Sequence, residues 1–107
     1  PSCVEVGNLC VDTSSSIVKK DGQEVFLSAL EYRLLLVFLN NANRIVTRDR
    51  LIDELWDAAG EFVTNNALTV YIKRLREKIE SDPAHPQIIL TVRGMGYRLG
   101  DGHAPQS

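Results

Sequence analysis

The chain contains 107 residues, of which 44% are hydrophobic and 24% are charged, with a formal net charge of −2. These values are typical of a single globular domain, so they exclude wholesale disorder. The longest uninterrupted apolar run, residues 34–39, is far shorter than the roughly 20 residues of a membrane-spanning helix. No signal-peptide pattern opens the chain. We therefore expect a cytoplasmic domain over residues 3–100 with no membrane partner, and a disordered polar tail at 101–107.

The charges are unevenly distributed along the chain. Residues 71–98 carry six basic and three acidic side chains, whereas the rest carries six basic and eleven acidic ones. Because the local field steers a charged partner more than the net charge does, the C-terminal third is the candidate surface for a polyanion.

The two cysteines, Cys3 and Cys10, both lie near the N-terminus. A disulfide framework in a small secreted domain usually has four or more cysteines. The histidines, His85 and His103, lie too far along the chain to complete a zinc-binding set. This pattern predicts two free thiols and no metal site.

Four short apolar or β-branched runs predict strands at 3–6, 9–11, 16–19 and 24–27. Turn residues separate them, and Asp21-Gly22 is typical of a two-residue hairpin turn. We expect an antiparallel four-stranded meander within residues 3–27.

Helical periodicity then predicts three helices within residues 28–80. Ser28 and Glu31 form a capping-box pattern at the start of the first helix, which ends at 40–43 and is followed by a short extended link at 45–46. Thr47 caps the second helix. We expect Trp56 to pack its ring on the core near the end of that helix, with its indole N–H toward a phosphate, and residues 57–63 to form a loop.

The third helix is predicted over 64–80, with one narrow apolar stripe. The stripe consists of Leu68, Ile72, Leu75 and Ile79. After a proline-containing loop, a hairpin is expected over 88–99 with its turn at Arg93-Gly94-Met95-Gly96. The predicted class is therefore α+β, with four strands, three helices and a C-terminal hairpin.

Catalysis is not predicted by these residues. His85 lies in a proline-flanked loop and His103 in the tail, so neither is expected to be held against a nucleophile. The glycines at 94–96 do not form a phosphate-binding or dinucleotide-binding motif. We expect no enzyme activity and no cofactor.

The face of the third helix opposite its apolar stripe is basic and amide-rich, which favours DNA binding in the major groove. Asn66 would pair with adenine, Lys73 or Arg74 with guanine, and Val70 or the Thr69 methyl group would contact thymine. Arg76 and Lys78, further along the helix, are suited to phosphates. The alternative is a solvated face stabilised by i,i+4 ion pairs such as Lys73–Glu77 and Arg76–Glu80.

At the hairpin turn, Arg93 is placed to enter an adjacent minor groove, where narrow A·T tracts concentrate negative potential. The alternative is an ordinary exposed turn arginine. Tyr97 is expected to pack its ring on the core and to present its hydroxyl to the DNA backbone.

Several sequence blocks resemble the OmpR/PhoB-type winged-helix effector domain. They lie at 27–35, 44–48, 51–56 and 71–76, and the most specific is Thr91-Val92-Arg93-Gly94-Met95-Gly96-Tyr97-Arg98. The resemblance covers about residues 4–99. It implies a winged helix-turn-helix at the output end of a two-component response regulator, behind a phosphorylated receiver domain in a missing N-terminal part.

The resemblance also implies site residues and partners. In the major groove it places Asn66, Thr69, Tyr71, Lys73 and Arg74; on the DNA backbone Trp56, Arg76, Thr91 and Tyr97; and in the minor groove Arg93. It implies homodimers on direct DNA repeats, and contact with RNA polymerase through residues 57–63. Two alternatives stay open: a membrane-anchored one-component regulator, and a winged helix used only for protein interaction.

Overall fold

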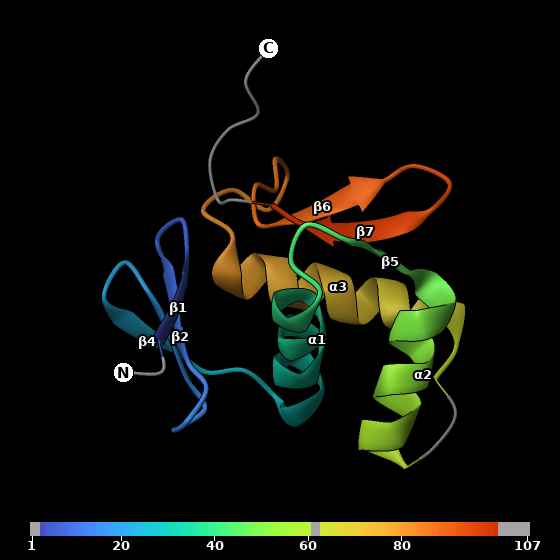
Figure 1. Cartoon of the computed structure of the whole chain (residues 1–107), viewed down its shortest axis with the longest axis horizontal. Coiled ribbons are helices and arrows are strands. Elements are labelled where there is room, and N and C mark those ends of the chain that lie inside the picture. The colour runs from blue at the N-terminus through green and yellow to red at the C-terminus, as the bar shows by residue number, and fades with distance from the viewer. Residues whose placement is uncertain (1–2, 61–62, 101–107) are drawn as a thin grey trace.

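The computed structural model describes residues 3–60 and 63–100 of the chain (Figure 1). In chain order the elements are β1 (Cys3–Val6), β2 (Leu9–Asp12), β3 (Ile17–Lys20), β4 (Gln23–Val25), α1 (Ala29–Asn40), β5 (Ile45–Thr47), α2 (Arg48–Ala59), α3 (Asn65–Ile79), β6 (Ile89–Val92) and β7 (Gly96–Leu99). This order confirms the predicted α+β winged-helix architecture. The predicted tail at 101–107 lies outside the described residues.

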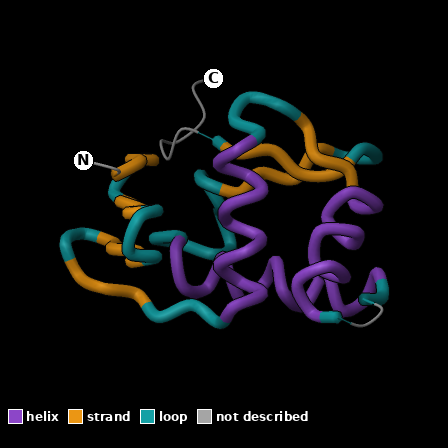
Figure 2. The backbone as a smooth tube through the Cα atoms, turned by 60° about the horizontal axis from the view of Figure 1, so that its bottom comes forward, coloured by secondary structure: helices purple, strands orange, loops and turns teal. Residues whose placement is uncertain are grey.

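The N-terminal sheet is the antiparallel meander that the alternation predicts, with strand order β1-β2-β3-β4. Asp21 and Gly22 both have positive φ, 53° and 81°, as a two-residue hairpin turn between β3 and β4 requires. One face of the sheet contributes buried Leu9, Val11 and Val18 to the core. The sheet lies to one side of the helices, apart from the C-terminal hairpin (Figures 1 and 2).

Residues 45–46 are extended, as predicted for a short extended link, but the sequence did not predict that they form part of a sheet. They belong to β5, which pairs antiparallel with β7 to give a three-stranded sheet of order β5-β7-β6. The pairing needs a residue without a side chain at Gly96, since a Cβ there would lie 2.2 Å from the Val46 carbonyl oxygen. A three-residue strand whose partner lies about 50 residues away leaves little local signal in the sequence.

Helix α2 is longer than predicted, because residues 57–59 are helical and not part of a loop. The helix ends at Gly60, which adopts φ 72° and donates its N–H to the Trp56 carbonyl, as a C-terminal glycine cap does. Residues 61 and 62 of the predicted 57–63 loop lie outside the described residues.

The Trp56 ring was predicted to pack on the core, but Trp56 does not belong to the buried core cluster. Its side chain is 47% exposed, whereas its neighbour Leu55 is fully buried. One residue rotates an α-helix by about 100°, so Leu55 takes the inward position and Trp56 points away from it.

Helix α3 crosses the middle of the molecule, between the β5-β7-β6 sheet and the other two helices (Figure 1). All four residues of its predicted apolar stripe are buried, at 2% exposure or less. The opposite face of the helix is thereby fixed toward solvent. Among the described residues, no helix is both long and apolar enough to span a bilayer.

Helix α1 begins with the predicted capping box. Ser28 Oγ accepts the Glu31 N–H, and the Glu31 carboxylate accepts the Ser28 N–H. The same carboxylate, nearly buried, also accepts a hydrogen bond from the Lys78 ammonium of α3. Burial opposes ionisation, but the hydrogen bonds from Lys78 and Ser28 outweigh it and lower the pKa of Glu31 below 4.5.

Glu31→Gln should therefore remove a pH-dependent part of the stability. A lowered folded-state pKa means that the contribution is present above the unfolded pKa and is lost as the pH falls through the folded value. Glutamine keeps the cap but not the charge opposite Lys78. Urea unfolding of both proteins should show a difference in the free energy of unfolding at neutral pH. This difference should shrink below about pH 4.5. A difference that stays constant with pH would contradict the assigned ion pair.

The prediction of two free thiols was wrong, since Cys3 and Cys10 are joined by a disulfide. In the β1–β2 register Cys3 lies opposite Asp12 and Cys10 opposite Glu5, so the cysteines are diagonal neighbours. Their Cα atoms are 6.1 Å apart, within the range that a disulfide spans.

Candidate nucleic-acid interface

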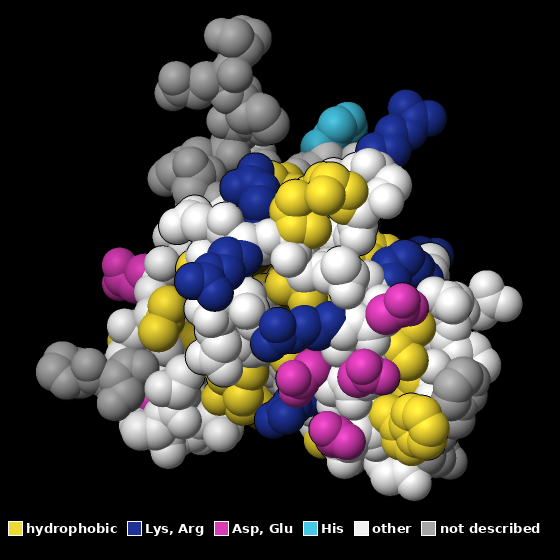
Figure 3. Space-filling model, turned by 45° about the vertical axis from the view of Figure 1, so that its right-hand side comes forward, with side chains coloured by type: hydrophobic (Ala, Val, Ile, Leu, Met, Phe, Trp, Pro, Cys, Tyr) yellow, Lys and Arg dark blue, Asp and Glu magenta, His cyan; other side chains and the backbone are white. Residues whose placement is uncertain are grey.

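The outer face of α3 presents side chains of the kinds that read base edges. Five of the predicted contact residues are exposed there: Asn66, Thr69, Val70, Lys73 and Arg74. Val70 is 44% exposed and is the apolar residue of this set. Viewed from the side of α2 and the hairpin turn, the surface carries several Lys and Arg side chains across its centre and upper part, with Asp and Glu gathered below them (Figure 3).

Arg48, at the first position of α2, joins three elements and was not singled out from the sequence. Its guanidinium donates to the Tyr97 hydroxyl at 2.8 Å, to the Asn65 carbonyl at 2.8 Å and to Thr69 Oγ1 at 2.9 Å. It thereby holds the start of α3 against β7. The sequence showed only an arginine after the Thr47 cap, since its partners lie 17 or more residues away.

Arg76 is held in a similar way and also lies close to the Tyr97 ring. Its guanidinium donates to the Ile89 carbonyl at 2.8 Å and to Thr91 Oγ1 at 2.9 Å, and lies 5.6 Å from the centre of that ring. Partial burial lowers the pKa of Arg76, although a guanidinium stays protonated at neutral pH. Arg76 therefore brings a positive charge to the junction of α3 and the hairpin.

The Tyr97 ring is 7% exposed and packs edge-to-face on Phe38, with ring centres 6.5 Å apart. This confirms that the ring belongs to the core. Its hydroxyl lies at the surface end, where it accepts the hydrogen bond from Arg48. Tyr97 thus anchors two arginines in fixed positions beside α3.

Glu80, the C-cap of α3, is a second residue whose role was missed. Its side chain is 2% exposed, and its carboxylate accepts hydrogen bonds from the backbone N–H groups of Gln87, Ile88 and Ile89 at 2.9–3.1 Å. The sequence suggested an i,i+4 pair with Arg76 instead. The observed contacts attach the start of β6 to the end of α3. They thereby set the direction of the hairpin.

The hairpin turn stands clear of the body of the domain. Arg93 and Met95 are exposed, and Gly94 adopts φ 76°, which suits a tight turn. A hollow of about 470 Å³ separates this turn from the start of α2, with Arg48, Thr91 and Tyr97 among its lining residues. A further hollow of about 310 Å³ lies along α3, lined in part by Thr69, Lys73 and Arg76. Thr91 and Tyr97 therefore border the first hollow, and Thr69, Lys73, Arg76 and Tyr97 border the second.

Two predicted contact residues of α3 have partners within the domain. The Lys78 ammonium is bound to Glu31 at the start of α1, so a phosphate contact would require that ion pair to open. Tyr71 is half-buried and packs against the core.

Both the sequence and the fold of this chain match those of known proteins. The sequence model of the family described as "Transcriptional regulatory protein, C terminal" matches residues 22–99. The sensory transduction protein RegX3 of Mycobacterium leprae is 42% identical over 98 residues, which cover 90% of this chain and 48% of RegX3.

Two solved structures share the fold. Response regulator DrrB of Thermotoga maritima, an OmpR/PhoB homologue, matches with a TM-score of 0.84 at 31% identity, over 92% of this chain and 44% of DrrB. The DNA-binding domain of RstA from Klebsiella pneumoniae, in complex with the RstA box, matches with a TM-score of 0.80 at 28% identity, over 94% of this chain and 99% of that domain. The chain thus spans less than half the length of RegX3 or DrrB.

Proposed function

This chain belongs to the family of transcriptional regulatory protein C-terminal domains, of the OmpR/PhoB type, and from that we propose that it binds double-stranded DNA in a sequence-specific manner to regulate transcription. The observation that carries the proposal is the exposed polar and basic face of α3, fixed outward by the four buried residues of the apolar stripe. The family's description refers to the regulation of transcription, and we propose no enzymatic reaction for this chain.

We propose that α3 enters the major groove and reads bases through its outward side chains. Asn66 is suited to adenine, and Lys73 or Arg74 to guanine. The Thr69 hydroxyl is already engaged, donating to the Asn65 carbonyl and accepting from Arg48. The methyl group is therefore the part of the Thr69 side chain that is available to a thymine methyl, and the Val70 side chain is available in the same way.

Phosphate contacts are proposed for the residues around Tyr97 and for the end of α2. Arg76 and Thr91 lie together at the junction of α3 and β6, and Trp56 is exposed near the end of α2. Arg48 joins this proposed set because it borders the hollow between α2 and the hairpin. Such contacts fix the register of the protein on DNA without reading its sequence.

Arg93 is proposed to insert into the minor groove beside the site read by α3. Arg93→Ala should then weaken binding to duplexes with A·T-rich flanks more than to duplexes with G·C-rich flanks, because narrow A·T tracts attract an inserted arginine. Fluorescence anisotropy on a pair of duplexes that differ only in the flank measures this. Equal losses on both duplexes would show that Arg93 is an ordinary exposed turn residue.

For the whole protein we propose a response regulator, with a receiver domain in the part of the relatives that this chain does not span. Binding as a homodimer to direct repeats, and contact with RNA polymerase through residues 57–63, belong to the same proposal. The shared fold of DrrB and the identity to RegX3 support it.

Selection from a random duplex library tests the proposed function. We expect enrichment of a short motif, repeated in tandem when two copies bind together. A double variant, Lys73→Ala with Arg74→Ala, serves as the control and should enrich no motif. If the native chain enriches none either, α3 is a solvated surface, and a winged helix for protein interaction becomes the better interpretation.

A further inference from the structure

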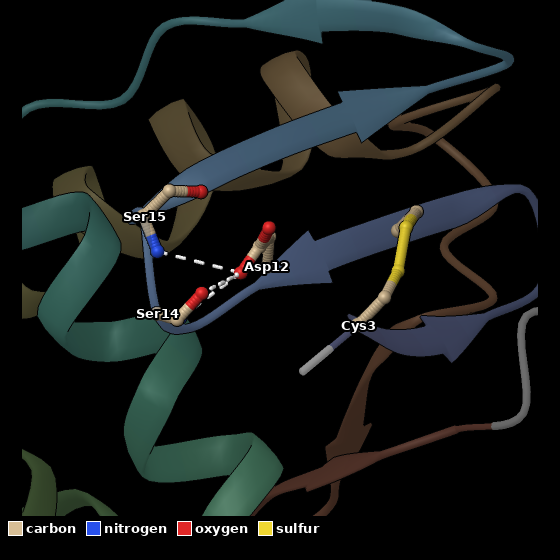
Figure 4. Close-up of a disulfide and its surroundings, with 5 residues drawn as sticks. Cys3, Asp12, Ser14 and Ser15 are labelled. Atoms are coloured by element: carbon tan, nitrogen blue, oxygen red, sulfur yellow. Dashed lines mark hydrogen bonds between the residues drawn. A yellow bond between two sulfur atoms is a disulfide. The ribbon is translucent and has the colours of Figure 1, made fainter. Parts of the chain in front are cut away.

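The disulfide between Cys3 and Cys10 lies on the outer face of the N-terminal sheet (Figure 4). This sheet lies on the opposite side of the molecule from α2 and the hairpin turn (Figure 1). Cys3 is exposed and Cys10 half-buried, so both sulfur atoms lie at or near the surface. Neither cysteine belongs to the buried core cluster. Small molecules in solution can therefore reach this bond without the domain unfolding.

Apart from this bond, strand β1 has few contacts that hold it in place. It is an edge strand that pairs only with β2, and of its four residues Val6 alone is buried. An edge strand with little buried surface is expected to open at low free-energy cost.

The two ends of the β1–β2 hairpin differ in how they are anchored. At the turn, Asn8 donates to Asp21 Oδ1 at 2.8 Å and to Ser81 Oγ at 3.3 Å, which fastens this end to the β3–β4 turn and to the loop after α3. Next to the turn, Val6 and Leu9 are buried.

At the other end, Cys3 pairs with Asp12, whose side chain instead accepts hydrogen bonds from Ser14 and Ser15 in its own turn (Figure 4). The disulfide is thus a covalent link at the loosely held end.

We propose that Cys3 and Cys10 form a reversible oxidation site for hydroperoxides, and that the disulfide locks the free end of β1 onto the sheet. The thiolate of the more exposed Cys3 attacks a peroxide oxygen, giving a sulfenic acid and water. The Cys10 thiol then attacks that sulfur, and a second water leaves. Two thiols and one hydrogen peroxide thus give one disulfide and two waters, with two electrons passing from sulfur to peroxide.

The reverse step uses a dithiol reductant. A thiolate of the reductant attacks one sulfur of the bond and forms a mixed disulfide, which its second thiol resolves to release both cysteines as thiols. The loop closed by the bond contains only a tight turn between paired strands, so the ladder holds the two cysteines close in the reduced state. That proximity favours an intramolecular bond over one between two chains.

The experiment compares the reduced and oxidised chain by mass spectrometry and by amide hydrogen exchange in NMR. The chain is reduced with dithiothreitol, desalted and treated with stoichiometric hydrogen peroxide. We expect a monomer lighter by two hydrogens, with both cysteines blocked to alkylation, and full recovery of the thiols on renewed reduction. Amides of β1 should exchange about tenfold more slowly after oxidation, while those of α3 are unchanged.

Cys10→Ser is the matched control, because neither position is in the core and the variant is expected to fold. Peroxide should leave Cys3 of this variant as a sulfenic acid or a higher oxide, with no slowing of exchange in β1. Disulfide-linked dimers of the native chain, or equal β1 exchange in both redox states, would overturn the proposal. The readouts involve no DNA, so this outcome is independent of the proposed DNA binding.

Discussion

Glu80→Ala is expected to lower the free energy of unfolding by about 3 kcal/mol or more, the largest effect on stability that we predict for a single polar residue. The Glu80 carboxylate is the acceptor for three backbone N–H groups at the start of β6, and it is 2% exposed. Truncation leaves those donors without a partner in a buried place, and each unsatisfied donor costs about 1–3 kcal/mol. Urea denaturation followed by circular dichroism measures the change.

Glu77→Ala is the matched control for this variant. It lies on the exposed face of the same helix and removes the same charge, so a change within about 0.5 kcal/mol is expected. Equal, small effects of the two substitutions would show that water or backbone adjustment replaces the carboxylate. Glu80 would then not determine how the hairpin is attached to α3.

Arg74→Ala is expected to weaken binding to the selected DNA site by about 1–3 kcal/mol, which is roughly 5- to 150-fold in affinity, and to relax discrimination at one base pair. The guanidinium lies on the outward face of α3, and among the side chains of that face it has the geometry for a bidentate contact to guanine. Binding is measured by fluorescence anisotropy on the selected duplex and on single-base variants of it.

Arg33→Ala controls for the loss of one positive charge. Arg33 is exposed on α1, where it pairs with Glu54 of α2 at 2.9 Å, outside the proposed interface. It should change affinity little. If Arg74→Ala instead lowers affinity by the same factor on every sequence, Arg74 contacts phosphate and does not read a base.

Local patterns in the sequence predicted the elements well where the signal lies within a few residues. The capping box at Ser28, the apolar stripe of α3 and the Asp21-Gly22 turn each depend on neighbours in the chain, and the structure confirms all three. The resemblance in residues 91–98 added the winged-helix architecture, which periodicity alone does not specify.

Features that depend on distant partners could not be predicted in this way. The contacts of Arg48 join residues 17 to 49 positions apart, and β5 pairs with a strand about 50 residues later. The sequence suggested only a helical ion pair for Glu80, and its contacts with backbone N–H groups depend on the position of residues 87–89. For Cys3 and Cys10 the count of cysteines was misleading, whereas the hairpin register brings them together.

The central claim, that the outward face of α3 binds DNA, is tested most directly by the affinity for the selected duplex as a function of salt concentration. Neutralised phosphates release counterions, so log K should fall linearly with log salt, by roughly 0.9 for each phosphate contacted. We predict a steep slope for the native chain, a slope smaller by about one for Arg76→Ala, and loss of specific binding for Lys73→Ala with Arg74→Ala. Absence of salt-dependent binding by the native chain at micromolar concentration would contradict the account.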